Sequence, residues 1–504
     1  MLVGVDIGTT HCKAGLFDMH GSLIALAHCP TPTQQVAPGS VVYDPQQLWT
    51  AAAALIQEIA AKAGASRIAA VGIASMAETG VLIDRRSGKP RTSLIPWFDR
   101  DATAQADRIA RAADRFERFC ITGQYPSFKS GLTKLLYLRE QGALAPETVW
   151  LSAADYLAYR LTGELATDYS LAARSYAFRL DRQCWDTDWL ADWNLPAELF
   201  PRALPSGTPI GRVLMEQATQ VGLSLDTVVV IAGHDHVCAA FAVGATGEAT
   251  VFDSMGTAET LIGALPQRPL GHAEYQTGLT YGCHVVPERL YWMGGLSSSG
   301  GSVEWLRALL GDPPLAYAEL EALVDQAGPS PTGLLYFPYL LGSGTPHPDQ
   351  QVKAAFIGLG ANHTRAHLAK AVLEGIAYEL EFIRRAAESG TGVAIDIVVA
   401  AGGGTRNQHR MQIKADVGGH RVVVAPQAEA TVLGAALLAG IGCGVYRDAA
   451  DALKHIRSHA GPTYTPNQEQ HKQYRRIYEQ GYAPLQQPLR QIARNLAEKG
   501  ARAA

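Results

Sequence analysis

The chain has 504 residues, more than one ordinary hydrophobic core can organise, which predicts two or three domains. Hydrophobic residues make up 47% of the chain and charged residues 18%, so it can bury large cores and global disorder is excluded. The 43 basic and 47 acidic side chains leave a net charge of −4 without a single-sign tract, which excludes non-specific nucleic-acid binding.

The seven cysteines form no CxxC pair and their number is odd, so we expect free thiols in a reducing compartment. No signal-peptide pattern precedes the first apolar run, at residues 2–5. The longest helix-compatible uncharged run, residues 430–446, is shorter than the ~20 apolar residues that span a bilayer. We therefore expect a soluble, cytoplasmic protein.

The beginning of the chain predicts three strands, a helix and a fourth, buried strand. The helix covers residues 44–63, with Asp44 as its N-cap and Pro45 at its first helical position. Strands mixed with helices in this order indicate an α/β fold. The expected strands are residues 2–5, 13–17, 23–27 and 68–75.

A helical and loop-rich stretch at residues 100–220 leads to a buried strand at 228–232 and an apolar helix. After a break at residues 244–247, a strand, a turn at 253–257 and a second strand repeat the opening hairpin about 250 residues later, which we interpret as a weak internal repeat. Later elements are a helix at 364–388 with Thr364 as cap and Gly390 as stop, a strand at 395–401, a helix at 408–417, a strand at 421–425 and solvated polar helices from 450.

Common catalytic motifs are missing from the sequence. It contains no GxxxxGK[ST], GxGxxG, HExxH or GxSxG, so Walker ATPases, Rossmann dehydrogenases, zincins and α/β-hydrolases lose their main support. His234 and His236 could chelate a metal, but no third ligand has suitable spacing. Packing or substrate-shaping histidines are therefore favoured over metal ligands.

The first hairpin turn has the composition of a phosphate-binding turn. Gly8 lets backbone N–H groups approach phosphate oxygens, and the hydroxyls of Thr9 and Thr10 add donors. Asp6 at the strand end could hold Mg²⁺, and Lys13 adds positive charge. The alternative is a plain hairpin whose Asp and Thr side chains satisfy local backbone groups.

Two further glycine turns follow apolar strands, at Gly256-Thr257 and at residues 402–404. Three such turns favour a nucleotide site between two domains over the plain hairpin.

Four other residues suggest a site for a hydroxylated substrate. Asp235 follows a buried strand, where α/β proteins bind ligands, and could accept a proton from a hydroxyl; the alternative is a helix N-cap. Glu78 and Asp99 each follow a predicted strand, and their carboxylates could hold sugar hydroxyls while Trp97 covers the apolar face of a polyol. Each of these residues is also common at surfaces and caps.

Taken together, these motifs resemble the FGGY carbohydrate kinases, from residue 1 to about residue 450. The most specific stretch, residues 354–374 (AAFIGLGANHTRAHLAKAVLE), is similar to the carboxy-terminal signature of that family. Four more stretches follow the family's order and spacing, at residues 6–13, 97–99, 231–244 and 402–416.

The resemblance implies an α/β fold with two ribonuclease-H-like (actin-like ATPase) domains and a nucleotide cleft between them. The implied division is an N-terminal domain at residues 1–246 for the sugar and the catalytic base, a C-terminal domain at 247–450 for the nucleotide, and a helical segment at 451–504 packed on both.

Site residues carry over by position. Asp235 corresponds to the catalytic base and contacts the acceptor, and Asp6 corresponds to the aspartate that holds Mg²⁺ through water. Glu78, Trp97 and Asp99 complete the expected acceptor site. The expected ATP contacts are Gly8, Thr9, Thr10, Lys13, Gly256, Thr257, Gly300, Glu304, Gly403 and Asn407.

The acceptor itself is not fixed by the resemblance. Glycerol-kinase-like members have an arginine where this chain has Ala77, which argues against glycerol. Xylulokinase-like members have a Met-His pair there, and here Met76 is followed by Ala77, which argues against D-xylulose. Lys129 lies where some members place a substrate-contacting tyrosine, so that wall of the pocket also differs.

The implied function is transfer of the γ-phosphoryl group of MgATP to a hydroxyl of a tetritol, pentitol or pentulose. A small-molecule sugar or polyol is the expected partner, with a homodimer as an alternative to a monomer, and neither nucleic acid nor a membrane is expected. The other functions considered are an actin-like nucleotide-dependent switch, which would not need Asp235, Trp97 and Glu78, and a sugar sensor that has lost its kinase activity.

Overall fold

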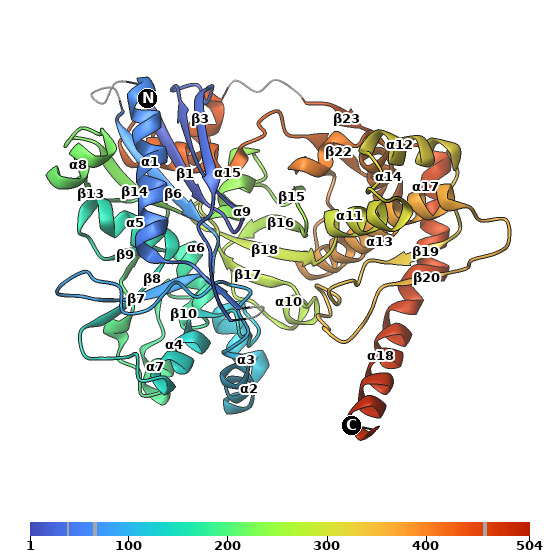
Figure 1. The fold of residues 1–504 in the computed structure, drawn as a ribbon, viewed down its shortest axis with the longest axis horizontal. Helices are drawn as coiled ribbons and strands as arrows, with labels where there is room; N and C mark the ends of the chain where they lie inside the picture. Colours follow the sequence, from blue (N-terminus) through green and yellow to red (C-terminus); the bar gives the residue numbers. More distant parts are fainter. Residues whose placement is uncertain (38–39, 64–67, 457–460, 504) are drawn as a thin grey trace.

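The computed structural model describes residues 1–37, 40–63, 68–456 and 461–503, and its two large sheets lie side by side (Figure 1). The first sheet has the strand order β13-β14-β6-β1-β2-β3. Strands β1, β2 and β3 form an antiparallel meander, whereas β6 is parallel to β1 and β14 is parallel to β6. The strands are β1 Leu2–Ile7, β2 His11–Phe17, β3 Leu23–Pro30, β6 Ala70–Ser75, β13 Pro209–Arg212 and β14 Val228–His234.

The second sheet repeats this topology, in the order β17-β18-β16-β15-β21-β22-β23. Strands β15, β16 and β18 form the antiparallel meander, and β21 and β22 add in parallel beyond β15. The two-domain α/β prediction and the internal repeat are therefore confirmed. The strands are β15 Thr250–Met255, β16 Glu259–Pro266, β17 Thr280–Cys283, β18 Arg289–Leu296, β21 Ile397–Ala401, β22 Arg421–Val424 and β23 Thr463–Tyr464.

Short strands and helices complete the two domains. The short strands are β4 Gln34–Ala37, β5 Ser40–Val42, β7 Gly80–Asp84, β8 Thr148–Ser152, β9 Ala166–Asp168, β10 Phe178–Arg179, β11 Cys184–Trp185, β12 Arg202–Leu204, β19 Leu335–Phe337 and β20 Ala355–Ile357. The α-helices of the first half are α1 Pro45–Ala63, α2 Thr103–Ala112, α3 Arg115–Thr122, α4 Gly131–Glu140, α5 Ala153–Thr162, α6 Tyr169–Ala172, α7 Thr187–Asp192, α8 Met215–Val221 and α9 Asp235–Ala242. Those of the second half are α10 His272–Gln276, α11 Gly300–Leu310, α12 Tyr317–Gln326, α13 Arg365–Thr391, α14 Gln408–Gly418, α15 Ala430–Gly442, α16 Ala449–His455, α17 Gln468–Ile477 and α18 Ala483–Ala503, and single turns are η2 Ala173–Ser175, η3 Ala197–Leu199, η4 Gly403–Arg406 and η5 Tyr478–Tyr482.

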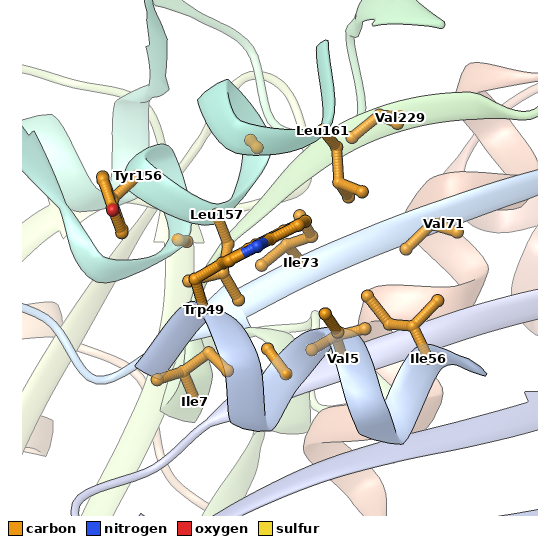
Figure 2. Close-up of a cluster of buried hydrophobic side chains, with 14 of the residues drawn as sticks. Val5, Ile7, Trp49, Ile56, Val71, Ile73, Tyr156, Leu157, Leu161 and Val229 are labelled. Carbon is orange, nitrogen blue, oxygen red and sulfur yellow. The ribbon is translucent and has the colours of Figure 1, made fainter. Parts of the chain in front are cut away.

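Helix α1 buries its apolar face against the first sheet (Figure 2). Trp49 and Ile56 pack with strand residues such as Val5 and Ile73, and all are fully buried. Each large apolar side chain buried in this way contributes roughly 1.5–3 kcal/mol to folding. The helix begins as expected, because Asp44 Oδ1 accepts a hydrogen bond from the backbone N–H of Gln47 at 2.8 Å.

Helices α9 and α15 join the two halves of the chain. Although α15 follows the strands of the second sheet, it packs on β1, β6 and β14 of the first and on α9, which in turn contacts β15 and β16. The packing is very close, because a Cβ on Gly4 would lie 1.8 Å from the carbonyl oxygen of Val432, and one on Gly434 would lie 2.1 Å from that of Cys238. The predicted division after residue 246 stays a prediction.

Three expected elements differ in the structure. Strand β15 continues to Met255, so Asp253 lies within a strand and not in the turn. Helix α13 runs past Gly390 to Thr391 and is capped by Gly392 in the left-handed conformation, with φ of 74°. The C-terminal helices are not simply solvated: Tyr474, Tyr478 and Tyr482 are buried against the second domain.

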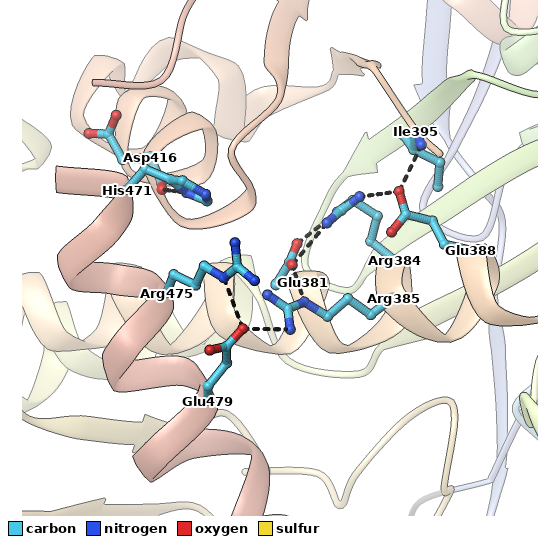
Figure 3. A network of polar contacts seen from close by, with 9 residues as sticks. All are labelled: Glu381, Arg384, Arg385, Glu388, Ile395, Asp416, His471, Arg475 and Glu479. Atoms are coloured by element: carbon cyan, nitrogen blue, oxygen red, sulfur yellow. Dashed lines mark hydrogen bonds and ion pairs between the residues drawn. The ribbon is translucent and has the colours of Figure 1, made fainter. Parts of the chain in front are cut away.

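Ion pairs connect α13 with η5 and α17, and a hydrogen bond between His471 Nδ1 and the Asp416 carbonyl connects α17 with α14 (Figure 3). Glu381 of α13 accepts hydrogen bonds from Arg384 and Arg385, and Arg385 reaches Glu479 at 3.5 Å. Glu479 also pairs with Arg475 at 2.9 Å, so the network crosses from α13 to the C-terminal helices. Within the described ranges, we find no helix with the length and apolarity that a bilayer crossing requires.

Candidate active site

Asp6 and Asp235 form a pair of half-buried carboxylates at the ends of β1 and β14, two parallel strands of the first sheet that are separated by β6. Asp6 lies near the end of β1, and Asp235 directly follows β14 as the first residue of α9. Burial raises the pKa of Asp6 well above its ordinary value, and the nearby Asp235 carboxylate raises it further. Burial also raises the pKa of Asp235 to about 7. The two carboxylates therefore lie close enough to repel each other when both are ionised.

This pair fits a divalent cation. Among the described residues, none donates a hydrogen bond to the buried Oδ1 of Asp6, so this oxygen has an unused ligand position. No group of three or more His, Cys, Asp or Glu side chains suitable for a metal occurs in the described part of the chain. Mg²⁺ suits such a site, because it binds through one or two carboxylates and keeps several waters.

Asp235 does not cap its helix. His234 occupies the N-cap position, and Asp235 Oδ1 accepts a hydrogen bond from the neighbouring His236 N–H at 2.7 Å. The N-cap alternative is thus wrong, because a cap would accept from an N–H two or three residues further on. Burial lowers the pKa of His236 to about 4 and also lowers that of His234, so both rings are neutral near Asp235.

Glu78 forms a buried ion pair with Arg174 of η2. The distance from Arg174 Nη2 to Glu78 Oε1 is 2.6 Å. Burial alone would raise the pKa of Glu78, but Arg174, Lys129 and Lys134 together lower it below its ordinary value. Arg174 Nη1 also donates to Thr280 Oγ1 of β17 at 3.2 Å, so this guanidinium contacts both domains.

The backbone of Glu78 is held in an unusual conformation. Its φ is 63°, in the left-handed region that non-glycine residues rarely adopt. Lys134 of α4 stabilises this turn by donating from Nζ to the carbonyl oxygens of Glu78 and Pro96. Such strain is tolerated where the surrounding structure fixes a side chain for function.

Trp97 connects this pocket to the first hairpin. Its indole Nε1 donates to Thr9 Oγ1 at 2.9 Å, and the Thr9 hydroxyl in turn contacts Met76 Sδ at 3.6 Å. The Lys129 ammonium lies 4.8 Å from the centre of the Trp97 ring. Trp97 and Glu78 are therefore parts of one site with Asp235. The negative charge of Glu78 raises the pKa of Asp235, in addition to the larger effect of burial.

Asp99 lies at the margin of the site. It is half-buried, and its Oδ1 accepts from the backbone N–H of Asp101 at 2.9 Å. Burial raises the pKa of Asp99, and the charge of Lys134 opposes this shift. Its predicted contact with the acceptor stays a prediction.

The first hairpin is closed by its own backbone and by β3. Gly8 N–H donates to the carbonyl of His11 at 3.1 Å, and Thr31 N–H donates to the carbonyl of Thr10 at 2.9 Å. The Thr10 side chain is exposed. Lys13 pairs at 2.6 Å with Glu429, which precedes α15, so its ammonium already has a partner from the other half of the chain.

The second hairpin supports the start of helix α11. Gly300 and Gly301 donate their N–H groups to the carbonyls of Gly256 and Thr257, at 3.2 and 3.0 Å. A Cβ on Gly300 would lie 2.5 Å from the Gly256 carbonyl oxygen, so only glycine permits this approach. Gly256, Thr257 and Gly300 thus form one turn and helix start in which Gly256 and Thr257 are exposed, and their predicted contacts with ATP stay predictions.

The remaining residues that are expected to contact ATP lie in different surroundings. The third turn lies against β15, since a Cβ on Gly402 would meet the Met255 carbonyl oxygen at 2.4 Å, and Gly403 has open space around it. Asn407 caps α14 by accepting from Arg410 N–H at 2.9 Å. The half-exposed carboxylate of Glu304 pairs with Arg307 at 2.6 Å and with the Tyr317 hydroxyl, and its predicted contact with ATP stays a prediction.

Arg174, Lys134 and Glu429 belong to the site but were not expected from the sequence. The partners of Arg174 and Lys13 are 96 and 416 residues away, so no local pattern indicates them. Lys134 did leave a signal, because it lies on the buried face of α4 between Thr133 and Leu135. A lysine in an otherwise apolar helix face indicates a fixed partner.

Comparisons with known proteins agree on one family. Residues 1–242 match the model of the FGGY family of carbohydrate kinases, N-terminal domain, and residues 253–443 match its C-terminal domain. The chain is 27% identical over 487 residues to a xylulose kinase of Lactococcus lactis, covering 95% of each chain. It is 31% identical over 456 residues to a glycerol kinase of Gloeobacter violaceus, covering 90% of each. Its fold is similar to that of a gluconate kinase from Lactobacillus acidophilus, with a TM-score of 0.90, 22% identity and coverage of 97% of this chain and 98% of the other.

Proposed function

The chain belongs to the FGGY family of carbohydrate kinases, and from this premise we propose that it transfers the γ-phosphoryl group of ATP to a hydroxyl of a small polyol or ketose. The observation that carries the proposal is the position of Asp235, half-buried at the end of β14, beside Asp6 and close to Glu78. A nucleotide-dependent switch without phosphotransfer would not need this arrangement, and the family assignment does not favour it.

Asp235 is the proposed general base. A base is most effective when its pKa is near the working pH, and burial raises the pKa of Asp235 to about 7. Its carboxylate takes the proton of the acceptor hydroxyl as that oxygen bonds to the γ-phosphorus, and the bond from phosphorus to the bridging oxygen of ADP breaks. His234 Nε2, at 3.2 Å from Asp235 Oδ1, and His236 N–H hold the carboxylate in place.

The acceptor is proposed to lie between Trp97, Asp99 and the Glu78–Arg174 pair. The indole offers an apolar face to the carbon chain of a polyol, and the pair offers both an acceptor and donors to its hydroxyls. Arg174 places a guanidinium beside the Glu78 carboxylate. This guanidinium comes from η2, whereas glycerol-kinase-like members have their arginine directly before the position of Glu78.

The nucleotide is proposed to bind across the two hairpins and the third turn. The exposed hydroxyls of Thr10 and Thr257 provide donors for phosphate oxygens, whereas the N–H groups of Gly8, Gly300 and Gly301 already donate to backbone carbonyls. Asp6 would hold Mg²⁺, which when bound neutralises phosphate charge. The two domains would close over both substrates and exclude water, which would otherwise accept the phosphoryl group.

A turnover screen with MgATP tests this function. The panel contains glycerol, tetritols, pentitols, ketopentoses and ketohexoses, and ADP and phosphorylated product are both measured. We expect a four- or five-carbon acceptor to have a higher kcat/KM than glycerol. The reason is that this chain has Ala77 where glycerol-kinase-like members have an arginine. Glycerol as the best acceptor would contradict the proposal on substrate, and ATP hydrolysis without sugar phosphate would contradict the kinase.

Two further expectations complete the proposal. All seven cysteines, which lie in the described part of the chain, are unpaired, and this supports a reducing, cytoplasmic location. A homodimer is supported by α18, which extends from the body (Figure 1) and exposes Ile492 and Leu496 by 54% and 67%. Light scattering of the full chain measures the oligomeric state.

A further inference from the structure

Strand β14 contains a β-bulge just before the proposed general base. It is parallel to β6, and the register of the two strands shifts between Ile231 and Gly233, so Ala232 is an extra residue without a partner in β6. Gly233 has φ of 121°, in the left-handed region that favours glycine. Because a bulge re-aims the side chains that follow it, the position of Asp235 depends on what holds this bulge.

A buried side-chain relay contacts the backbone at the bulge. Ser170 Oγ accepts a hydrogen bond from the backbone N–H of His234 at 2.9 Å. The same hydroxyl donates its proton to Asp168 Oδ2 at 2.6 Å, so its lone pairs are left for the His234 N–H. Both side chains are fully buried. We call these two residues the Asp168–Ser170 relay.

The relay and the bulge are packed directly against each other. A Cβ on Gly233 would lie 2.3 Å from Ser170 Oγ and 2.6 Å from Asp168 Oδ2, so only glycine permits this approach. Asp168 is itself fixed, because its carboxylate caps α6 by accepting from the N–H groups of Ser170 and Leu171, each at 3.0 Å. Buried polar groups that are fully hydrogen-bonded in this way make a structure rigid.

The segment that carries Ser170 also reaches the acceptor pocket. Arg174 follows Ser170 by four residues, in η2, and pairs with Glu78 at 2.6 Å. The segment of α6 and η2, residues 169–175, therefore contacts the turn before Asp235 at one end and the proposed acceptor pocket at the other.

We propose that Ser170, held by Asp168, is a positioning residue that sets the place of the Asp235 carboxylate relative to the acceptor hydroxyl. This inference rests on the proposed role of Asp235 as general base and adds a residue that acts through it. Ser170 acts through the backbone of His234, the residue directly before Asp235. Proton transfer requires the two oxygens to lie within hydrogen-bond reach, and a displacement of about 1 Å can cost roughly 100-fold in rate.

Ser170→Ala removes the acceptor of the His234 N–H and should lower kcat by roughly 10- to 100-fold. The KM for ATP should change little, because the proposed nucleotide contacts lie on the hairpins. Ser206→Ala is the matched control: Ser206 also donates its hydroxyl to Asp168 Oδ2, at 2.5 Å, and its removal leaves the contact between Ser170 and His234 in place. It should keep the wild-type kcat. Wild-type kcat in Ser170→Ala, or equal losses in the two serine variants, would overturn the proposal.

A double variant distinguishes positioning from a merely structural role. In an Asp235→Asn background, Ser170→Ala should have little further effect on the residual kcat, because the carboxylate that Ser170 positions is absent. A structural role would lower the residual activity by the same factor as in the wild type, and that result would reject the positioning role. Each kcat is measured well below the thermal midpoint of the variant.

Hydrogen exchange separates this inference from the proposed function. The backbone amide of His234 should exchange faster in Ser170→Ala than in the wild type or in Ser206→Ala. If no acceptor is phosphorylated but the exchange of this amide depends on Ser170, the kinase proposal fails and the support of the bulge stands. If a sugar phosphate forms and neither kcat nor this exchange responds to Ser170→Ala, the kinase stands and the positioning proposal fails.

Discussion

Arg174 Nη2 lies 2.6 Å from Glu78 Oε1, and the two side chains are only 8% and 11% exposed. Glu78 comes from the turn after β6, whereas Arg174 lies 96 residues further on, in η2, and also contacts Thr280 of the second domain. The pair therefore connects the proposed acceptor pocket to β17 of the second domain. It also explains how a carboxylate can stay ionised in a buried place.

Replacing Arg174 by Met should destabilise the protein strongly. The change leaves the Glu78 carboxylate buried without its partner, and breaking such a pair costs about 3–5 kcal/mol. The pKa of Glu78 is lowered in the folded protein, so the pair stabilises at pH values above the ordinary glutamate pKa and this contribution is lost as the pH falls through the lowered pKa. Urea unfolding at about pH 7 and about pH 4 should show a larger loss at the higher pH.

The double variant Glu78→Gln with Arg174→Met is the control for this prediction. Because it removes both charges, it should recover part of the lost free energy of unfolding. A single variant as stable as the wild type at neutral pH would show that the pair has no energetic role.

Thr257→Val should weaken ATP binding and leave acceptor binding nearly intact. The Thr257 side chain is exposed at the second hairpin, and its backbone carbonyl already accepts from Ser299 at 2.9 Å and from Gly301 at 3.0 Å. Valine therefore preserves the turn and removes only the hydroxyl. We expect a rise in KM for ATP of about 5- to 30-fold, the value of one hydrogen bond to a charged group or slightly less. Unchanged ATP kinetics would mean that this hairpin is only a structural repeat.

Gly434→Ala tests the close packing between the two halves. The added Cβ would lie 2.1 Å from the carbonyl oxygen of Cys238 in α9, and backbone cannot move aside as a side chain can. We expect a loss of about 1–3 kcal/mol in the free energy of unfolding. Gly247→Ala is the control, since nothing lies within 4 Å of its added Cβ. Equal thermal midpoints for the two variants would contradict the packing argument.

The sequence predicted the repeated sheets and the carboxylates at the strand ends, because both depend on local apolar patterns and on turn residues. It placed Asp253 in a turn equivalent to that of Asp6, and this was wrong. When Gly256 is aligned with Gly8, Asp253 falls one position before the counterpart of Asp6. Side chains alternate between the faces of a strand, so Asp253 turns away and pairs with the buried Lys414.

The counter-charges of the site were beyond prediction from the sequence. Glu429 and Arg174 pair with residues hundreds or nearly a hundred positions away, and such contacts follow from the packing of the domains and not from local periodicity. The neutral state of His236 likewise depends on its burial in the folded chain and on the charge of Arg174. The sequence supplied one member of each pair, Glu78 and Lys13, and the structure adds the partner of each.

Asp235→Asn is the most direct test of the catalytic assignment. The amide keeps the size of the side chain but cannot accept a proton, so kcat should fall by roughly 10²–10⁴-fold, equivalent to about 3–5 kcal/mol of transition-state stabilisation. ATP affinity should change little, because the proposed phosphate donors lie on the hairpins. An active Asn variant would end the general-base assignment.

The pH dependence of the same variant separates catalysis from structure. With a pKa of about 7, wild-type Asp235 should give kcat/KM an acid limb that falls about tenfold per pH unit below neutrality, and the residual activity of the Asn variant should lack it. Because the folded pKa is raised, the native protein retains a proton that the unfolded chain has lost between about pH 4 and pH 7, so ionisation of Asp235 destabilises the fold as the pH rises. Asn removes this cost, and since Asp235 does not cap α9, both Asn and Ala variants should keep or exceed the wild-type thermal midpoint at about pH 8. A loss of about 0.5–2 kcal/mol in the Ala variant alone would instead indicate a cap.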